Sequence, residues 1–147
     1  PVLNSPLLSI HVSIIMMSYA LLSLTFISAI AYFFTRNSKR ESVISVNKQL
    51  TDLSQIFLYP AITTLGLGIF IGAIWANISW GTYWGWDPKE TWALITFLIY
   101  AIPLHTNSLP ALRKPEKYHF FMLLSFLSIL MTYFGVNYIL GGMHSYA

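Results

Sequence analysis

The sequence predicts an all-α integral membrane protein: four transmembrane helices, with an outward-facing Trp-rich loop between helices 2 and 3. Three observations support this class. Of the 147 residues, 56% are hydrophobic and only 9% are charged, whereas soluble domains carry about 25% charged residues. The mean hydropathy is +0.63. The apolar residues also fall in long runs separated by polar segments, as membrane-spanning helices require. We therefore expect residues 1–147 to form a single membrane domain.

The first apolar run covers residues 10–34, and His11 lies at its start. At about 1.5 Å per residue, this run is long enough to cross a bilayer as a helix. The lead-in, residues 1–9, contains prolines and polar residues that disfavour a helix. Residues 36–54 are polar and rich in basic side chains, so we expect a loop or a surface helix outside the membrane.

The second run, residues 56–78, contains Gly68 and Gly72, whose spacing of four lets helices approach closely. A helix contact is sufficient to explain the two glycines. The last run, residues 118–140, predicts another span, which ends at two glycines shortly before His144.

The third run is apolar only over residues 92–104, which is too few residues to span a bilayer comfortably. Two alternatives remain. The helix continues past His105 toward Leu109 and holds this histidine within the hydrocarbon layer, or it ends early with a kink at Pro103.

The basic residues predict the orientation of the chain. Seven of the eight Lys and Arg residues lie in the segments that follow the first and third runs, and only Lys89 lies elsewhere. The positive-inside rule therefore assigns these two segments to the cytoplasm or stroma. With four spans, both ends of the chain and the loop between helices 2 and 3 face outward.

Composition excludes several classes of function. The chain has no cysteine, so it has no disulfide, thiolate metal site or thiol chemistry of its own. The net charge of +3 is small and unevenly distributed, so it bears on orientation and does not indicate nucleic-acid binding. No carboxylate lies within an apolar run, which argues against a cation transporter.

The most unusual stretch is residues 80–92, which contains four of the five tryptophans. They are Trp80, Trp84, Trp86 and Trp92. Aromatic rings are common at the membrane interface, but four in thirteen residues, spaced by glycines, indicate a flat apolar platform. Such a platform suits a planar ligand.

The Asp87-Pro88-Lys89-Glu90 segment has the pattern of a helix start, with an acidic N-cap, proline at the first position and glutamate at the third. This role alone explains Asp87 and Glu90. Lys89 is the one outward cation and is suited to pairing with a carboxylate of a ligand. A solvent-exposed lysine in the first turn of a helix is an equally good explanation.

The run WGTYWGWDPKETW resembles the WWD domain of the haem-handling proteins of cytochrome c biogenesis. Within that superfamily it is most similar to the CcsA family, also called ResC, the membrane half of the system II cytochrome c synthase (haem lyase). CcmC and CcmF carry variants of the loop, and the WDPKE continuation favours CcsA. Family members are longer and have more spans, so the resemblance implies that this chain is a carboxy-terminal portion.

The resemblance also implies a ligand and its site. In the family, haem b binds at the WWD loop between two outward-facing histidines, which match His11 and His144. Interfacial histidines near helix ends are otherwise common. His105 matches a histidine of a second, inner haem site, whose opposite ligand comes from the partner subunit, CcsB or ResB; a snorkelling interfacial residue is the alternative. We expect His119 to be interfacial, without a role.

The function implied is binding, translocation and presentation of haem for covalent thioether attachment to the CXXCH motif of apocytochrome c, whose thiols thioredoxin-like proteins keep reduced. The chain is not expected to act as a synthase without its partner. The membrane is a bacterial inner membrane or, alternatively, a plastid thylakoid. The competing hypotheses are a CcmC-type transporter that hands haem to a chaperone without synthase activity, and a purely structural membrane subunit.

Overall fold

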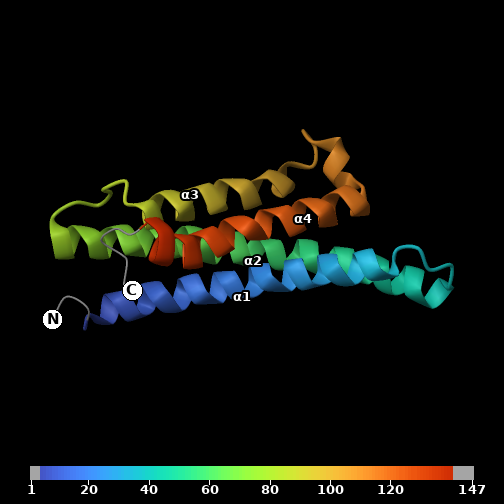
Figure 1. The fold of residues 1–147 in the computed structure, drawn as a ribbon, viewed down its shortest axis with the longest axis horizontal. Coiled ribbons are helices and arrows are strands. Elements are labelled where there is room, and N and C mark those ends of the chain that lie inside the picture. The colour runs from blue at the N-terminus through green and yellow to red at the C-terminus, as the bar shows by residue number, and fades with distance from the viewer. Residues whose placement is uncertain (1–3, 141–147) are drawn as a thin grey trace.

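The computed structural model describes residues 4–140, which form an elongated bundle of helices (Figure 1). The first two helices are α1 (Pro6–Thr35) and α2 (Glu41–Trp80), and α3 (Pro88–Ala101) follows the tryptophan loop. Two short 3-10 helices, η1 (Ile102–His105) and η2 (Pro110–Arg113), lead to α4 (Pro115–Leu130), which continues as the π-helix η3 (Met131–Leu140). The start of α1, the tryptophan loop and the end of η3 lie at one end of the bundle.

Three helical segments are long and apolar enough to cross a membrane: α1, α2, and α4 together with η3. By contrast, α3 has 14 residues, so it is about 21 Å long, shorter than a hydrocarbon core of about 30 Å. Its α-helical part ends at Ala101, and Pro103 lies in the 3-10 turn that follows. The shorter of the two alternatives is therefore correct. The all-helical prediction is confirmed, whereas the count of four spans stays a prediction.

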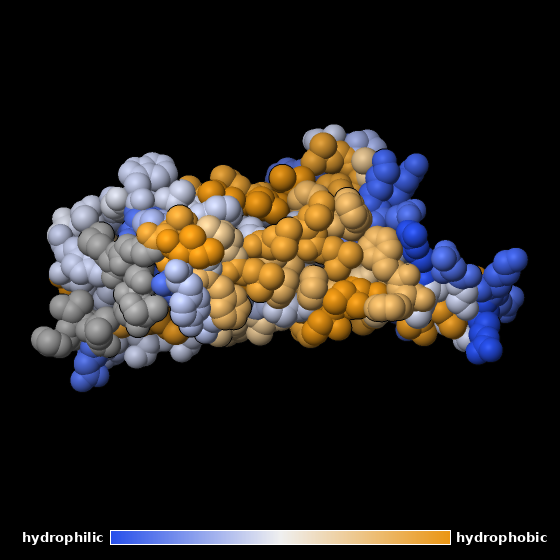
Figure 2. Space-filling model, in the orientation of Figure 1, coloured by the Kyte–Doolittle hydropathy of each residue, from blue (hydrophilic) through white to orange (hydrophobic). Residues whose placement is uncertain are grey.

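The start of α1 differs from the prediction, whereas the polar start of α2 is the surface helix that was one of the two alternatives. The lead-in was expected to disfavour a helix, but α1 begins at Pro6, because proline is tolerated at the first helical position. The 40 residues of α2 make it about 60 Å long, so its polar first part extends beyond the apolar region as a surface helix. Figure 2 shows hydrophilic residues at this end and a hydrophobic band along the middle.

Small polar side chains fill much of the interior of the bundle. The buried serines and threonines are Ser18, Thr25, Ser28, Thr51, Ser54, Thr96, Ser125, Ser128 and Thr132. Most of their hydroxyl groups donate to a carbonyl of their own helix, such as Ser28 to Leu24 at 2.8 Å. Many large apolar side chains, such as Phe70 and Leu127, are exposed. This arrangement is typical of helices that pack together in lipid, where small interior residues allow close approach.

His119 was expected at the interface, and this prediction is wrong. Its side chain is 0% exposed, and its ring stacks on Tyr32 of α1 with centroids 4.5 Å apart. The Nε2 atom lies 2.9 Å from Thr51 Oγ1 on α2. Since the Thr51 hydroxyl donates to the Asn47 carbonyl, it accepts from His119, which therefore carries its proton on Nε2. His119 thus joins α4 to both α1 and α2.

Replacing this ring tests whether it holds the three helices together. His119→Ala leaves a cavity beside Tyr32 and removes the bond to Thr51, so we expect a loss of about 2–4 kcal/mol of stability. Thermal unfolding in detergent measures the effect. The neighbouring Phe120→Ala is the control, because this side chain is 55% exposed. Equal losses of stability in the two variants would contradict the role of His119.

Candidate functional site

The tryptophan loop starts where α2 ends, at Gly81. This glycine has a φ of 78° and donates its N–H to the Asn77 carbonyl at 2.9 Å, a left-handed cap that favours glycine. On the helix side of the cap, Trp80 packs edge-on against Trp75 with ring centroids 4.9 Å apart. Because Trp75 is buried and both residues belong to α2, this contact packs the last turn of the helix from which the loop departs.

The far end of the loop is held by the predicted helix start, which the structure confirms. The buried Asp87 carboxylate accepts from the Lys89 N–H at 2.9 Å. Glu90 Oε2 accepts from the N–H groups of Gly85 at 2.8 Å and Asp87 at 3.3 Å. The two carboxylates therefore satisfy backbone donors on both sides of the start of α3, as a capping box does.

Trp86 adopts an unusual conformation in this loop. Its φ is 56°, in the left-handed region that large side chains rarely occupy and that costs about 1–2 kcal/mol. Its ring is 69% exposed and meets Trp84 edge-on, with centroids 5.8 Å apart. Backbone strain of this kind is concentrated at functional sites, so Trp86 marks the loop as a candidate ligand surface.

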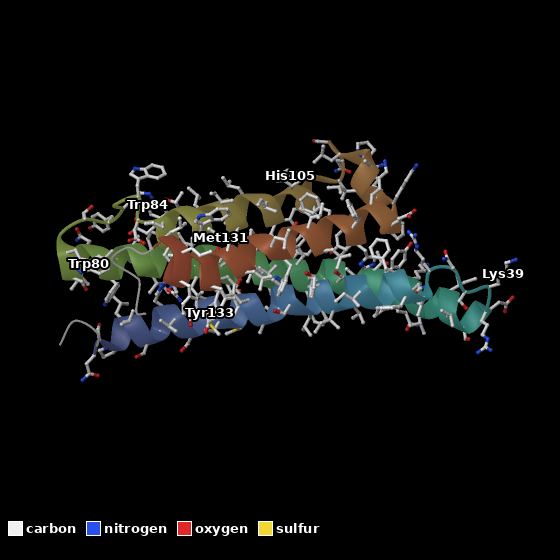
Figure 3. All side chains as sticks on the ribbon, viewed as in Figure 1. Lys39, Trp80, Trp84, His105, Met131 and Tyr133 are labelled. Carbon is white, nitrogen blue, oxygen red and sulfur yellow. The ribbon has the colours of Figure 1, made fainter. Side chains whose placement is uncertain are left out.

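A cavity of about 420 Å³ lies beneath the loop and has mostly apolar walls from α1, α2, α3, the loop and η3. His11, Trp84 and Lys89, all predicted site residues, line it together. The indole N–H of Trp84 is buried and has no hydrogen-bond partner among residues 4–140. Figure 3 shows Trp80 and Trp84 at the same end of the molecule. The volume is in the range of small-molecule sites.

His11 lies in the second turn of α1, and its Nδ1 is 2.7 Å from the Gly68 carbonyl oxygen on α2. A carbonyl can only accept, so Nδ1 carries the proton and the lone pair of the neutral ring is on Nε2. Metal-bound histidines are usually held in this way, with the second nitrogen donating to a carbonyl. The ring of His11 therefore has the tautomer of a histidine that ligates through Nε2.

Gly72 provides the surface on which this ring rests. A methyl group added at Gly72 would lie 2.5 Å from Cε1 and 2.8 Å from Nδ1 of His11, closer than real side chains pack. At Gly68 an added methyl would lie 2.5 Å from Ile15 Cδ1. The predicted close helix contact is therefore present, and in addition it holds His11. The sequence showed the glycine spacing but not which residue of α1 lies against it.

A polar corner of the cavity lies where α3 meets η3. Lys89 Nζ donates to Asn137 Oδ1 at 3.0 Å, and the Asn137 side chain donates to the Tyr133 carbonyl of η3 at 2.8 Å. Burial lowers the pKa of the Lys89 ammonium, and the nearby Asp87 carboxylate opposes this change. A partly buried ammonium in a mostly apolar cavity is suited to a carboxylate ligand. Asn137 and Tyr133 were not among the residues predicted for the site.

The remaining predicted residues lie elsewhere. Trp92 is half-buried on α3, where its carbonyl accepts from Thr132 Oγ1 at 3.3 Å, and like Trp80 it does not line the cavity. His105 is exposed at the end of η1, with Nδ1 2.9 Å from the Ala101 carbonyl, far from Trp84 in Figure 3. His144 lies outside the described residues.

The side chains in the cavity suit a metal macrocycle better than a bare metal ion. Between residues 4 and 140 there is no group of three or more His, Cys, Asp or Glu that could hold a metal. The cavity has one histidine, which suits an iron atom, and an apolar wall, which suits a flat macrocycle. Its indole N–H and ammonium suit the carboxylates of a porphyrin.

The sequence matches the family described as "Cytochrome C assembly protein" over residues 1–144. The chain belongs to this family. Protein NrfI of Wolinella succinogenes is 45% identical over 154 residues, which cover all of this chain and 17% of NrfI. The cytochrome c biogenesis protein CcsA of Mesostigma viride is 35% identical, over 99% of this chain and 56% of its own length. That of Chlamydomonas reinhardtii is 37% identical, over 99% and 42%.

These similarities confirm the predicted resemblance to CcsA and a general role in cytochrome c biogenesis. The chain spans about half the length of the CcsA proteins and a smaller part of NrfI.

Proposed function

We propose that the cavity beneath the tryptophan loop binds haem b, with His11 Nε2 as one axial ligand of the iron. The observation that carries this proposal is the bond from His11 Nδ1–H to the Gly68 carbonyl, because it places the lone pair of the neutral ring on Nε2, the nitrogen that would bind the iron. Membership of a cytochrome c assembly family agrees with haem as the ligand.

The tryptophans provide the surface against which the macrocycle lies. Trp84 lines the cavity, and Trp86 extends this surface outward through its edge-on contact. Trp80 and Trp92 support the loop from α2 and α3. The Asp87 carboxylate caps α3. Asp87 therefore contributes to the site by fixing the end of the loop. The Lys89 ammonium and the Trp84 indole N–H are the donors for the haem propionates.

Two further histidines complete the proposed haem path. We assign His144 as the second axial ligand on the basis of the family resemblance; the residue lies outside residues 4–140. We assign His105 to an inner haem site shared with a CcsB- or ResB-type partner. Its exposed position at the end of η1 supports a role at a contact with another chain.

The function is then presentation of haem for attachment to apocytochrome c. Haem supplies two vinyl groups, which the two thiols of a CXXCH motif add to as thioethers. This chain has no cysteine, so the thiols are those of apocytochrome c, kept reduced by thioredoxin-like proteins. The residues of this chain orient the macrocycle and keep its edge accessible at the exposed loop. The partner subunit is required for synthase activity.

His11 ligation predicts a specific spectrum. The purified chain should show the Soret band of low-spin, six-coordinate haem, and His11→Ala should lose this band and regain it on addition of imidazole. His105→Ala should lower haem content only when the partner subunit is present. If His11→Ala keeps the wild-type Soret band, His11 is not a ligand.

Gly72→Ala tests whether the position of the His11 ring matters, without changing any ligand. The added methyl displaces the ring, so we expect haem content to fall at least about tenfold, as for loss of a supporting residue. Gly66→Ala is the matched control on the same helix, where the added methyl meets only the edge of the Phe97 ring at 3.2 Å. The haem content of both variants is read from the pyridine haemochrome spectrum. Equal haem content in the two variants would contradict the idea that the contact between Gly72 and the His11 ring positions the ligand.

The proposed site faces outward, and the basic end of the bundle faces the cytoplasm or stroma. Figure 3 shows Lys39 and Trp80 at opposite ends of the molecule. A cysteine in place of the exposed Thr82 should react with an impermeant maleimide added outside intact cells or vesicles, and one in place of the exposed Ser42 should react only after permeabilisation. The reverse labelling pattern would invert the proposed orientation.

A further inference from the structure

A second cavity, of about 520 Å³, lies between α2 and the η1–η2 corner. Figure 1 shows this corner at the same end of the bundle as the basic loop between α1 and α2. The cavity has polar walls, including Asp52 and Arg113, and an apolar wall that includes Ile56 and Leu104. A combined polar and apolar lining at the end of an apolar bundle suits the headgroup region of a bilayer.

One wall presents a guanidinium in a fixed orientation. Arg113 Nε donates to the Thr106 carbonyl at 3.1 Å, and Nη2 donates to Asn107 Oδ1 at 3.2 Å. Arg113 forms no ion pair with a carboxylate of residues 4–140. A planar guanidinium held by neutral acceptors is well suited to bind a phosphate.

The opposite wall presents two acceptors on one face of α2. The Asp52 carboxylate has no hydrogen bond or ion pair to any other residue between 4 and 140. Four residues later, the carbonyl of Ile56 lacks its helical donor, because Pro60 lies inside α2 and has no N–H. Residues four apart share a helix face, and both line the cavity. A carboxylate beside an unsatisfied carbonyl matches a primary ammonium, which has three donors.

We propose that this cavity binds the headgroup of a phospholipid with a primary ammonium, such as phosphatidylethanolamine. The phosphate binds Arg113, the ammonium binds Asp52 and the Ile56 carbonyl, and the lipid chains leave along Ile56 and Leu104. A choline headgroup has the same two charges but no N–H donor. It can pair with Asp52 by charge alone, so the site selects ethanolamine over choline lipids.

Native mass spectrometry of the chain purified in detergent tests this selectivity. We titrate it with phosphatidylethanolamine or with phosphatidylcholine of the same acyl chains. The wild type should bind the ethanolamine lipid about tenfold more tightly, as expected for charge-assisted hydrogen bonds. Asp52→Asn should abolish the difference, and Arg113→Gln should weaken both lipids. Glu41→Gln, which alters another exposed acid of α2, should behave as the wild type.

Pro60→Ala is a second test that does not threaten the fold, because alanine favours a helix. It gives Ile56 its helical donor and should reduce the selectivity while leaving phosphate binding in place. Equal binding of the two lipids by the wild type would overturn the proposal, as would unchanged selectivity in both Asp52→Asn and Pro60→Ala. A fall in haem content in Arg113→Gln with unchanged lipid binding would instead assign the cavity to haem. Failure of haem binding at His11 leaves the lipid result unaffected.

Discussion

The candidate site depends on one hydrogen bond, from His11 Nδ1 on α1 to the Gly68 carbonyl on α2. Bonds between helices in membranes contribute only about 0.6 kcal/mol on average, so the importance of this bond lies in orientation rather than in stability. It sets the tautomer and the direction of the Nε2 lone pair at once. The bond is possible only because Gly68 and Gly72 let α1 lie directly against α2. An added methyl group would meet the His11 ring at Gly72 and the Ile15 side chain at Gly68, so residues of α1 favour glycine at both positions of α2.

The rest of the bundle keeps this contact in place. At the end of the bundle that carries the tryptophan loop, the capping carboxylates of Asp87 and Glu90 hold the loop to the start of α3. Toward the basic end, His119 joins three helices through Tyr32 and Thr51. Between these ends the interior is made of small hydroxyl side chains that let the helices pack closely. Packed helices thus carry His11, while the loop with its strained residue Trp86 lies over the cavity.

The sequence predicts the features that depend on neighbours along the chain. Apolar runs gave the helices, and the Asp87-Pro88-Lys89-Glu90 pattern gave the start of α3. The features it missed depend on how helices rotate against one another. The neighbours of His119 include Lys117, which suggested an interface, yet its burial comes from α1 and α2. In the same way, glycine spacing cannot identify His11 as the residue that packs on Gly72. No local sequence pattern predicted the π-helix that brings Asn137 to Lys89.

The most direct test of this account is a cryo-electron microscopy structure of the chain purified with its haem. We expect iron bonded to His11 Nε2, Nδ1 still on the Gly68 carbonyl, and the macrocycle against Trp84. Haem bound away from this cavity, or iron bonded to a His11 ring that has turned from Gly68, would contradict the central claim.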